Sequence, residues 1–572
     1  MQEDEKMKTV LCAINAKYIH TCLAVHYLKA ACRNLCETAV REFTINDPVN
    51  RIIWQLIDDE ADCYCFSCYI WNIEAVKKAA LAIKLALPHS VIIFGGPEVS
   101  YNAEGVLTQE PYVDYIISGE GEEALPKLLH SIGGSVESVP NLYYRKDEGI
   151  KYTFCAAPLE LDALPDAYGD GFEAGRVVYY ESSRGCPYSC SFCLSPALGK
   201  VRYRSLPKVF SDLKRFISHG VKQVKFVDRT FNADAGRTRE IFSYLMKNGR
   251  GANFHFEIAA HILDEETLTL LENVEKGLFQ FEIGVQSICE KTLDAIGRKQ
   301  DFSRLEKAVT RLKKTGNIHL HLDLIAGLPL EGLGEFRETL NEVFALKPDM
   351  LQLGFLKILH GSALKEETKK YGIVYCPYPP YEVLCTDSLP ACDMAVIKGV
   401  CWSLNLLCNK GGLSLAAGFI AGSTGVFDFL HAFAQWSKAR GYFNVEPGKE
   451  GAAAALCEYI KDQKGRDEQP AIELARYCFF KSAKNQSIPS FFSDGLTAGE
   501  RELARGYFRE QVYRDLPKMQ KGTAHRRALV CAFDHDVVGY DAGGGLIRRR
   551  TYVLFDHATG EMPKRIALPA AC

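Results

Sequence analysis

Short apolar runs alternate with segments of helical periodicity in two separate blocks, and this alternation restricts the fold more than any other feature. The first block covers residues 8–131, and the second covers residues 176–364. A strand followed by a helix, repeated along the chain, predicts parallel strands joined by crossover helices. We therefore expect two α/β sheets, each presenting its ligand-binding groups at the carboxyl ends of its strands.

The first block predicts a Rossmann-like, doubly wound sheet. Glycines follow several of its apolar runs, at Gly95, Gly96 and Gly119, where they permit close approach of the backbone to a ligand. A complete G-x-G-x-x-G motif is absent, which disfavours a dinucleotide site, and ordinary turns remain the alternative. The expected strands are 8–14, 61–67, 90–94 and 112–118, and the expected helices are 21–35, 73–87 and 122–132.

The second block predicts a partial (β/α)6 TIM-type barrel, because six strands alternate with helices. Its expected strands are 177–182, 223–228, 253–259, 278–285, 319–325 and 350–356. Beyond it, helices broken by glycine pairs are expected in 388–431, and paired strands in 528–535 and 549–557. The expected parts are therefore a Rossmann-like domain (1–145), a linker (146–175), a barrel (176–364) and a mainly helical C-terminal substrate or accessory domain with a few strands (365–572).

Three cysteines that follow the first barrel strand form the most specific motif, Cys186-x3-Cys190-x2-Cys193. Three soft ligands at this spacing can hold three irons of a 4Fe-4S cluster and leave the fourth iron open. A zinc site would need a fourth ligand, which the loop lacks.

The polar, acidic start of the chain contains no signal sequence, so we expect a cytoplasmic protein whose thiols stay reduced.

This loop resembles the radical S-adenosylmethionine (SAM) superfamily, in which the open iron binds SAM. The resemblance implies that Phe192 lies beside the adenine, and that a flavodoxin or ferredoxin-type reductant supplies the electron that cleaves SAM to a 5'-deoxyadenosyl radical. Three later stretches, around Phe256-Glu257-Ile258, Gly284-Val-Gln286-Ser287 and Asp323-Leu-Ile-Ala-Gly327, are similar to oxygen-independent coproporphyrinogen oxidase, as is Ile296-Gly-Arg298. They imply that Glu257, Gln286, Arg298 and Asp323 hold SAM.

One departure from the family pattern concerns the segment after the second barrel strand. The usual glycine-rich patch is replaced by Val227-Asp228-Arg229-Thr230-Phe231-Asn232. We expect Asp228 and Arg229 to take over part of the SAM contact or to face the substrate, and we assign them as the catalytic residues.

The first block, placed before such a barrel, resembles the cobalamin-binding domain of cobalamin-dependent radical SAM enzymes. The Asp-x-His-x-x-Gly motif that supplies a lower histidine ligand is absent, and Asn15-x-Lys17-x-x-His20 stands near its place. The resemblance therefore implies cobalamin without a histidine lower ligand. The residues expected to contact it are Asn15, Tyr18, Ser67, Gly95, Gly96, Gly119 and Glu120.

Together the two resemblances imply an anaerobic enzyme that transfers a methyl group to an unactivated carbon of a small molecule or a modified macromolecule. Radical rearrangement or cyclisation, and porphyrinogen-type oxidation without methyl transfer, remain open. A non-catalytic cobalamin sensor is a further alternative, which the intact cysteine motif disfavours.

The near-neutral balance of 68 Lys and Arg against 71 Asp and Glu argues against a nucleic-acid partner bound by bulk charge. The apolar segment 413–430 predicts a buried helix and no membrane span.

The chain contains 21 cysteines, and most are expected to be small buried side chains. Cys63-x-Cys65-x-x-Cys68 is an alternative site for a second cluster, although buried thiols are the favoured interpretation. Four cysteines of the C-terminal part are spaced at seven, nine and seven residues: Cys385, Cys392, Cys401 and Cys408. This spacing predicts that they share one buried helical face, and an auxiliary cluster is the alternative.

Overall fold

The computed structural model describes residues 7–147, 149–173, 175–444, 446–463, 468–483, 487–508, 528–557 and 562–568. The chain divides into two compact units. The first consists of residues up to Phe336 with Leu346–Pro348 and Gly354–Ala391, and the second of Arg337–Ala345, Asp349–Leu353 and the residues from Cys392 onward.

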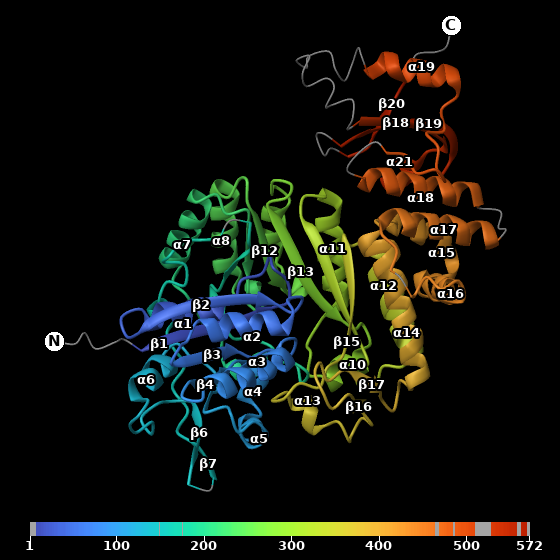
Figure 1. Ribbon diagram of the computed structural model, residues 1–572. Helices are drawn as coiled ribbons and strands as arrows, with labels where there is room; N and C mark the ends of the chain where they lie inside the picture. The colour runs from blue at the N-terminus through green and yellow to red at the C-terminus, as the bar shows by residue number, and fades with distance from the viewer. Residues whose placement is uncertain are drawn as a thin grey trace. The chain divides into compact units, whose positions relative to one another are not determined.

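The first unit begins with a seven-stranded sheet in the order β2-β1-β3-β4-β5-β6-β7, drawn in blue to cyan in Figure 1. The five strands from β2 to β5 are parallel, whereas β6 and β7 form an antiparallel hairpin on the β5 edge. The bounds are β1 (Lys8–Asn15), β2 (Glu37–Thr44), β3 (Cys63–Ser67), β4 (Val91–Gly95), β5 (Tyr115–Ile117), β6 (Leu142–Lys146) and β7 (Gly149–Tyr152).

Helices cover both faces of this sheet, as a doubly wound fold requires. One face packs against α1 (Leu23–Cys32) and α6 (Ala124–Ser131). The other face packs against α2 (Val49–Asp58), α3 (Ile73–Ala86), α4 (Pro97–Ser100) and α5 (Ala103–Gln109). The Rossmann-like prediction is confirmed. The sequence did not predict β2, α2, or the β6–β7 hairpin, and β7 and the 3-10 helix η1 (Leu161–Ala163) lie within the expected linker.

A second sheet follows in the order β15-β14-β13-β12-β11-β8. Neighbouring strands from β8 to β14 run parallel and in chain order, as a partial barrel requires, and all six predicted strands are present. They are β8 (Val178–Tyr180), β11 (Gln223–Phe226), β12 (Asn253–Ile258), β13 (Phe279–Gln286), β14 (His319–Ala326) and β15 (Met350–Phe355). The helices of this region are α7 (Leu206–Ser218), α8 (Ala235–Asn248), α9 (Glu265–Leu271), α10 (Glu290–Ala295), α11 (Phe302–Thr315) and α12 (Leu333–Ala345).

The strands of the second sheet alternate apolar and polar residues. In β12, Phe254 and Phe256 are fully buried, and the ring of Phe256 lies 5.2 Å from that of Phe242 on α8. His255 and Glu257 point to the opposite face, because successive side chains of a strand alternate. The same alternation recurs in β13 and β14. The sheet therefore has an apolar face that packs on helices and a polar face.

Smaller elements connect these strands and extend the first unit. Short strands β9 (Ser183–Arg184) and β10 (Arg202–Tyr203) pair antiparallel, and so do β16 (Val374–Tyr375) and β17 (Val383–Cys385). The short helices are η2 (Ser195–Leu198), η3 (Phe231–Ala233), η4 (Ala260–Ile262) and α13 (Ala363–Glu366).

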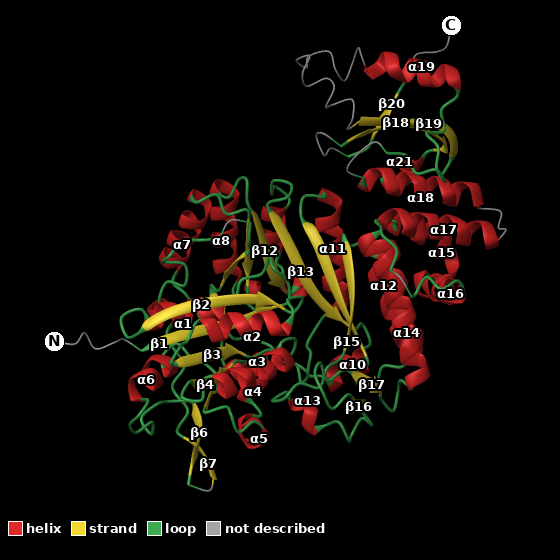
Figure 2. Cartoon of the chain, in the orientation of Figure 1, coloured by secondary structure: helices red, strands yellow, loops and turns green. Residues whose placement is uncertain are grey.

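The second unit is mainly helical, with one three-stranded antiparallel sheet in the order β18-β19-β20 (Figure 2). The expected pairing of two C-terminal strands is confirmed. The helices are α14 (Ala391–Leu404), the π-helix η5 (Asn405–Lys410), α15 (Ser414–Ala421), η6 (Gly422–Thr424), α16 (Val426–Ala439), α17 (Lys449–Gln463), α18 (Glu468–Ser482), α19 (Ala498–Tyr507) and α21 (Val537–Asp541). The strands are β18 (Ala528–His535), β19 (Arg548–Asp556) and β20 (Lys564–Ile566).

The expected buried face of four C-terminal cysteines is wrong. Cys385 lies at the end of strand β17 and Cys392 is exposed, so helical periodicity does not join them. In the described part of the chain, Ala391–Lys410 forms one helix long and apolar enough to cross a membrane, with 44% of its most apolar window buried. Ser414–Thr424 and Val426–Ala439 pass the same test as a pair bent by 108°. Core helices of soluble proteins meet these criteria too.

Candidate active site

The three motif cysteines lie on one loop, residues 185–201, between β9 and β10. Cys190 is buried, and Cys186 and Cys193 are half-buried. Each thiol has a polar neighbour: the Sγ of Cys186 lies 3.4 Å from the hydroxyl of Thr230, and that of Cys193 accepts the amide of Ser195 at 3.4 Å. Burial raises the pKa of the Cys190 thiol, and the Arg298 guanidinium, whose Nη1 lies 3.7 Å from this sulfur, opposes the rise.

Three thiols on one loop are the ligand set of a 4Fe-4S cluster with one open iron. Among the described residues, no three His, Cys, Asp or Glu side chains gather closely enough to hold one metal ion. In a 4Fe-4S cluster each cysteine binds a different iron, so its three thiols stand apart around the cluster. The loop supplies three such thiols, and their role as cluster ligands stays a prediction.

Backbone contacts hold the cluster loop in place. The amide of Ser191 donates to the carbonyl of Ile296 at 2.9 Å, and the carbonyl of Ser191 accepts from the amide of Leu364 at 2.8 Å. Gly185 has a φ of +107°, and a Cβ there would lie 2.8 Å from the carbonyl oxygen of Lys200. Glycine is therefore required where the two ends of the loop cross.

Asp228 holds the chain that leads into this loop. It is 1% exposed, accepts the amide of Ser182 at 3.0 Å, and accepts the hydroxyls of Ser182 and Ser183 at 2.6 Å each. Burial raises its pKa to about 6. These contacts make Asp228 a positioning residue, and its predicted catalytic role stays a prediction. Arg229 is exposed, and its predicted catalytic role likewise stays a prediction.

The polar face of the second sheet carries an ion-paired layer that the sequence did not single out. Glu282 on β13 lies 2.9 Å from the His255 ring and 3.0 Å from the Lys225 ammonium. Burial acts to raise the pKa of Glu282, but His255 and Lys225 outweigh it and lower the value to about 2. On β14, His321 lies 3.1 Å from Asp323. The signal was present in the sequence as alternation of Phe or Leu with charged residues.

Two of the residues predicted to hold SAM present polar groups without a partner beside this layer. The Gln286 side-chain oxygen is buried without a hydrogen-bond partner in the described chain, whereas Asp323 is paired with His321. The Glu257 carboxylate likewise has no hydrogen bond or ion pair there, and burial raises its pKa to about 7. Gln286 also has a φ of +66°, a conformation that costs about 1–3 kcal/mol. Such atoms suit a bound polar ligand.

The remaining predicted SAM contacts, Arg298 and Phe192, lie beside the end of β13 and on the cysteine loop. Arg298 donates to the backbone carbonyl of Gly284 and to the side-chain oxygen of Gln300 at 3.2 Å. It therefore joins the β13 end to Cys190, beside which its guanidinium lies. Phe192 is half-buried on the cluster loop. The structure thus brings the cysteine loop and the four carried-over residues to one end of the sheet.

The predicted cobalamin contacts lie at the carboxyl edge of the first sheet. Asn15, Ser67 and Gly95 end β1, β3 and β4. Gly96 has a φ of +111°, and a Cβ there would lie 2.6 Å from the carbonyl oxygen of Cys68, whereas a Cβ at Gly119 (φ +83°) would meet no atom within 4 Å. Open space beside Gly119 and an exposed Tyr18 suit a ligand at this edge.

Several of these residues have structural partners in the described chain, and the Ser67 hydroxyl donates to the carbonyl of Cys12 at 3.3 Å. The Asn15 amide donates to the carbonyl of His20 at 3.1 Å and to Glu42 at 3.0 Å. Glu120 accepts the amide of Leu159 at 3.0 Å and is ion-paired to Arg184 and Arg202. Their predicted contact with cobalamin stays a prediction.

The alternative cluster at Cys63, Cys65 and Cys68 has no support in the geometry. Cys63 and Cys65 pack in the core between the sheet and α1 and α6, whereas Cys68 packs in the core on the opposite face. Burial raises the pKa of all three thiols. The favoured interpretation as buried thiols fits these positions.

The carboxyl edge of the first sheet meets the polar face of the second within the first unit. The loop from β1 to α1 carries His20, and its Nδ1 lies 2.5 Å from the hydroxyl of Tyr179 on β8. Tyr179 is in register with Lys225 of the ion-paired layer. Nearby, Glu42 and Arg176 form a nearly buried ion pair at 2.6 Å. The two groups of predicted cofactor residues therefore face one shared region.

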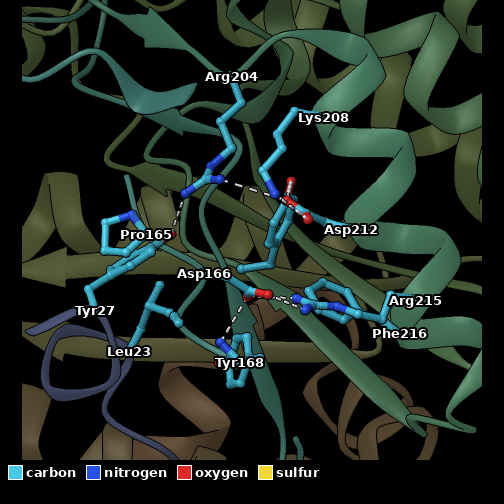
Figure 3. A pocket seen from close by; sticks show the side chains of 12 residues that line it. Leu23, Tyr27, Pro165, Asp166, Tyr168, Arg204, Lys208, Asp212, Arg215 and Phe216 are labelled. Atoms are coloured by element: carbon cyan, nitrogen blue, oxygen red, sulfur yellow. Dashed lines mark hydrogen bonds and ion pairs between the residues drawn. The ribbon is translucent and has the colours of Figure 1, made fainter. Parts of the chain in front are cut away.

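The pocket in Figure 3 lies elsewhere, between α1, the linker and α7. Its charged side chains are paired with one another: Asp166 with Arg215, Lys208 with Asp212 at 2.9 Å, and Arg204 with the Tyr27 hydroxyl at 2.8 Å. Because these charged groups already have partners, they are not free to bind a charged ligand. The pocket therefore lies at the contact between the linker and the region of the second sheet.

Comparison with known families assigns both blocks. Residues 9–129 match the B12 binding domain, and residues 180–343 match the radical SAM superfamily. Residues 369–555 match a family described as a protein of unknown function (DUF4080). The predicted families and the fold class are confirmed.

Among curated proteins, the chain is 26% identical over 358 residues to the cobalamin-dependent radical SAM methyltransferase TokK of Streptomyces tokunonensis, covering 56% of this chain and 51% of TokK. It is 26% identical over 320 residues to 2-(S-pantetheinyl)-carbapenam-3-carboxylate methyltransferase of Streptantibioticus cattleyicolor, covering 50% and 45%. The chain thus spans about half the length of these relatives.

Among solved structures, the cobalamin-dependent SAM radical enzyme OxsB with aqua-cobalamin aligns with a TM-score of 0.60 at 15% identity, over 82% of this chain and 80% of OxsB. The radical SAM methyltransferase TsrM of Kitasatospora setae aligns with a TM-score of 0.54 at 16% identity, over 63% and 76%. These two likenesses support the fold. Coproporphyrinogen III oxidase of Escherichia coli aligns with a TM-score of 0.29 at 19% identity, over 41% of this chain and 53% of the oxidase.

Proposed function

We propose that the chain is a B12-binding radical SAM enzyme and acts as a cobalamin-dependent C-methyltransferase on an unactivated carbon. Two methyltransferases that are 26% identical stand among its curated relatives, which supports this choice. The substrate is a small molecule or a modified macromolecule.

One observation carries the proposal: the loop that follows β1 of the B12-binding sheet reaches the polar face of the radical SAM sheet, where His20 contacts Tyr179 at 2.5 Å. A methyl donor bound at the first sheet and a radical source bound at the second would therefore share one reaction space. When bound, the iron–sulfur cluster and SAM supply hydrogen abstraction, and cobalamin supplies the methyl group.

The side chains of the protein divide the remaining work. The three cysteines hold the cluster, and Arg298 orients the β13 end beside Cys190. Glu257, Gln286 and Asp323 offer polar groups to the amino, carboxyl and ribose groups of SAM. The Gln286 side-chain oxygen has no hydrogen-bond partner in the described chain, and Asp323 is paired with His321. The ion-paired layer of Lys225, His255 and Glu282 holds these strands in register behind them.

The test is an analysis of products from the full chain, reconstituted anaerobically with iron, sulfide and cobalamin and reduced by dithionite or a flavodoxin system. We expect 5'-deoxyadenosine and S-adenosylhomocysteine to form together, because methyl transfer consumes one SAM as the radical source and a second as the methyl source. Release of 5'-deoxyadenosine alone would favour rearrangement, cyclisation or oxidation instead. Cobalamin binding without either product would leave the sensor alternative.

A further inference from the structure

The cluster loop and the B12-binding domain are joined by a compact group of ion pairs around Arg184. Its Nε and Nη2 donate to the two oxygens of Glu181 at 2.9 and 2.8 Å, and its Nη2 also donates to Glu122 at 2.7 Å. Its Nη1 lies 3.1 Å from Glu120. The side chains are only 10–17% exposed, so water screens these pairs weakly.

Arg184 and its cross-strand neighbour form the stem of the cluster loop. Arg184 on β9 pairs in register with Arg202 on β10, and residues 185–201 between them carry the three cysteines. Arg202 also binds Glu120, at 3.4 Å through Nη1 to the second oxygen. Both ends of the loop are therefore tied to the same glutamate.

Glu120 and Glu122 belong to the segment that follows β5, at the carboxyl edge of the B12-binding sheet. This segment begins at Ser118, whose hydroxyl donates to the carbonyl of Ser100, and continues through Gly119, whose amide donates to the Ser100 hydroxyl at 3.1 Å. Space beside Gly119 is open. A corrinoid at this edge would contact the segment that contains Glu120 and Glu122, whose side chains form ion pairs with the stem of the cluster loop.

We propose that Arg184 and Glu122 are positioning residues that couple the two cofactor sites, so that occupancy of the corrinoid site changes the affinity of the cluster for SAM. The inference rests on the proposed cofactors and not on the outcome of methyl transfer. Glu181 holds the Arg184 guanidinium by two hydrogen bonds, and the same guanidinium donates to Glu122, so displacing Glu122 moves a group that is fixed to the stem of the cluster loop. By linkage, SAM must change the affinity for corrinoid by the same factor.

The experiment is a double titration of the full chain after anaerobic reconstitution with iron and sulfide. The electron paramagnetic resonance signal of the reduced cluster reports SAM binding with and without hydroxocobalamin, and visible absorbance reports corrinoid binding with and without SAM. We expect each ligand to change the apparent dissociation constant of the other by at least about fivefold, the lower end of typical coupling. In Glu122→Gln we expect both factors to fall to within about twofold of unity.

The adjacent residue supplies a matched control. Glu123 is 40% exposed and pairs with Lys127 at 2.5 Å within its own helix, so Glu123→Gln keeps the coupling of the wild type. If Glu122→Gln loses iron or precipitates, Glu122→Asp keeps the charge but shortens the reach, and its coupling is expected between those of the other two proteins.

The outcomes separate this inference from the proposed function. Wild-type protein that binds both ligands independently, or Glu122→Gln with the full coupling factor, would overturn the coupling and leave the methyltransferase proposal intact. A chain that binds no corrinoid would overturn both. Coupled binding without S-adenosylhomocysteine formation would support the coupling and contradict methyl transfer.

Discussion

The two parallel sheets of the first unit are built by the same strand–helix alternation, yet they offer ligands different surfaces. Helices sandwich the first sheet, so β1 and β3 are buried on both faces and ligand groups appear only at the carboxyl edge. The second sheet packs helices on an aromatic face and lines its other face with charged side chains. The first sheet therefore presents a site at an edge, and the second presents one on a face as well.

The cysteines give the largest expected contrast between the two regions. In Cys190→Ala we expect reconstituted protein to lose most cluster iron and all 5'-deoxyadenosine release, because one iron loses its thiolate. In Cys65→Ala we expect iron content and SAM cleavage to remain, because Cys65 lies in the hydrophobic core beside α1 and α6. Iron analysis and product chromatography of both variants check this. If Cys65→Ala lost as large a share of its iron as Cys190→Ala, the first sheet would also hold a cluster.

Stability should distinguish the two faces of β12. The Phe256 ring lies 4.6 Å from that of Phe226 and 4.5 Å from that of Phe231, and none of its surface is exposed. Phe256→Ala is expected to reduce the free energy of unfolding by about 3–5 kcal/mol, since it leaves a cavity in this aromatic core. Hydrogen exchange of the β12 amides and the denaturant midpoint measure the loss.

The control for that prediction is the next residue, Glu257, whose side chain points to the polar face. Glu257→Gln leaves the aromatic core filled, so the denaturant midpoint of this variant should not fall with that of Phe256→Ala. Equal destabilisation by both substitutions would show that the polar face is packed as tightly as the aromatic one, and would remove the contrast between the faces.

The same contrast explains how much of the fold was predictable from sequence. Strands of the first sheet that are buried on both faces form continuous apolar runs and were found. Strand β2 was missed because it lies at the edge and interleaves polar residues, as in Glu37–Thr44. The hairpin of β6 and β7 was missed for a similar reason, since Lys146 and Lys151 interrupt its apolar pattern.

The candidate site was predictable where a motif defined it and not where long-range pairing did. The spacing of Cys186, Cys190 and Cys193 is local, and so it is visible in the sequence. Arg184 is adjacent to that motif, but its partners Glu120 and Glu122 lie some sixty residues away in another domain. No periodicity indicates such a contact, because only the folded chain brings a strand end of one sheet to the loop of another.

The smallest expected effect distinguishes two glutamates on the polar face, Glu257 and Glu282, which are in register on β12 and β13. Burial raises the pKa of Glu257 to about 7, above its unfolded value of about 4.3. Its contribution to stability is therefore full below about pH 4.3 and is lost as the pH rises through about 7. Glu257→Gln never ionises, so its stability relative to wild type should rise between pH 5.5 and 8.5.

Glu282 provides the opposite case, because His255 and Lys225 hold its pKa near about 2 against the effect of burial. Its contribution is present above an unfolded pKa of about 4.3 and is lost only as the pH falls toward about 2. Glu282→Gln should therefore be less stable than wild type, and the carboxyl itself adds no pH dependence between about pH 5.5 and 8.5, since both of its pKa values lie below this window. Any slope there reports the imidazoles of His255 and His321, whose pKa values Glu282 acts to raise. Denaturant midpoints at several pH values check both slopes. A flat difference for Glu257→Gln would mean that its carboxylate is ionised throughout, paired or hydrated as Glu282 is, and that the polar face holds no carboxyl group poised near neutral pH.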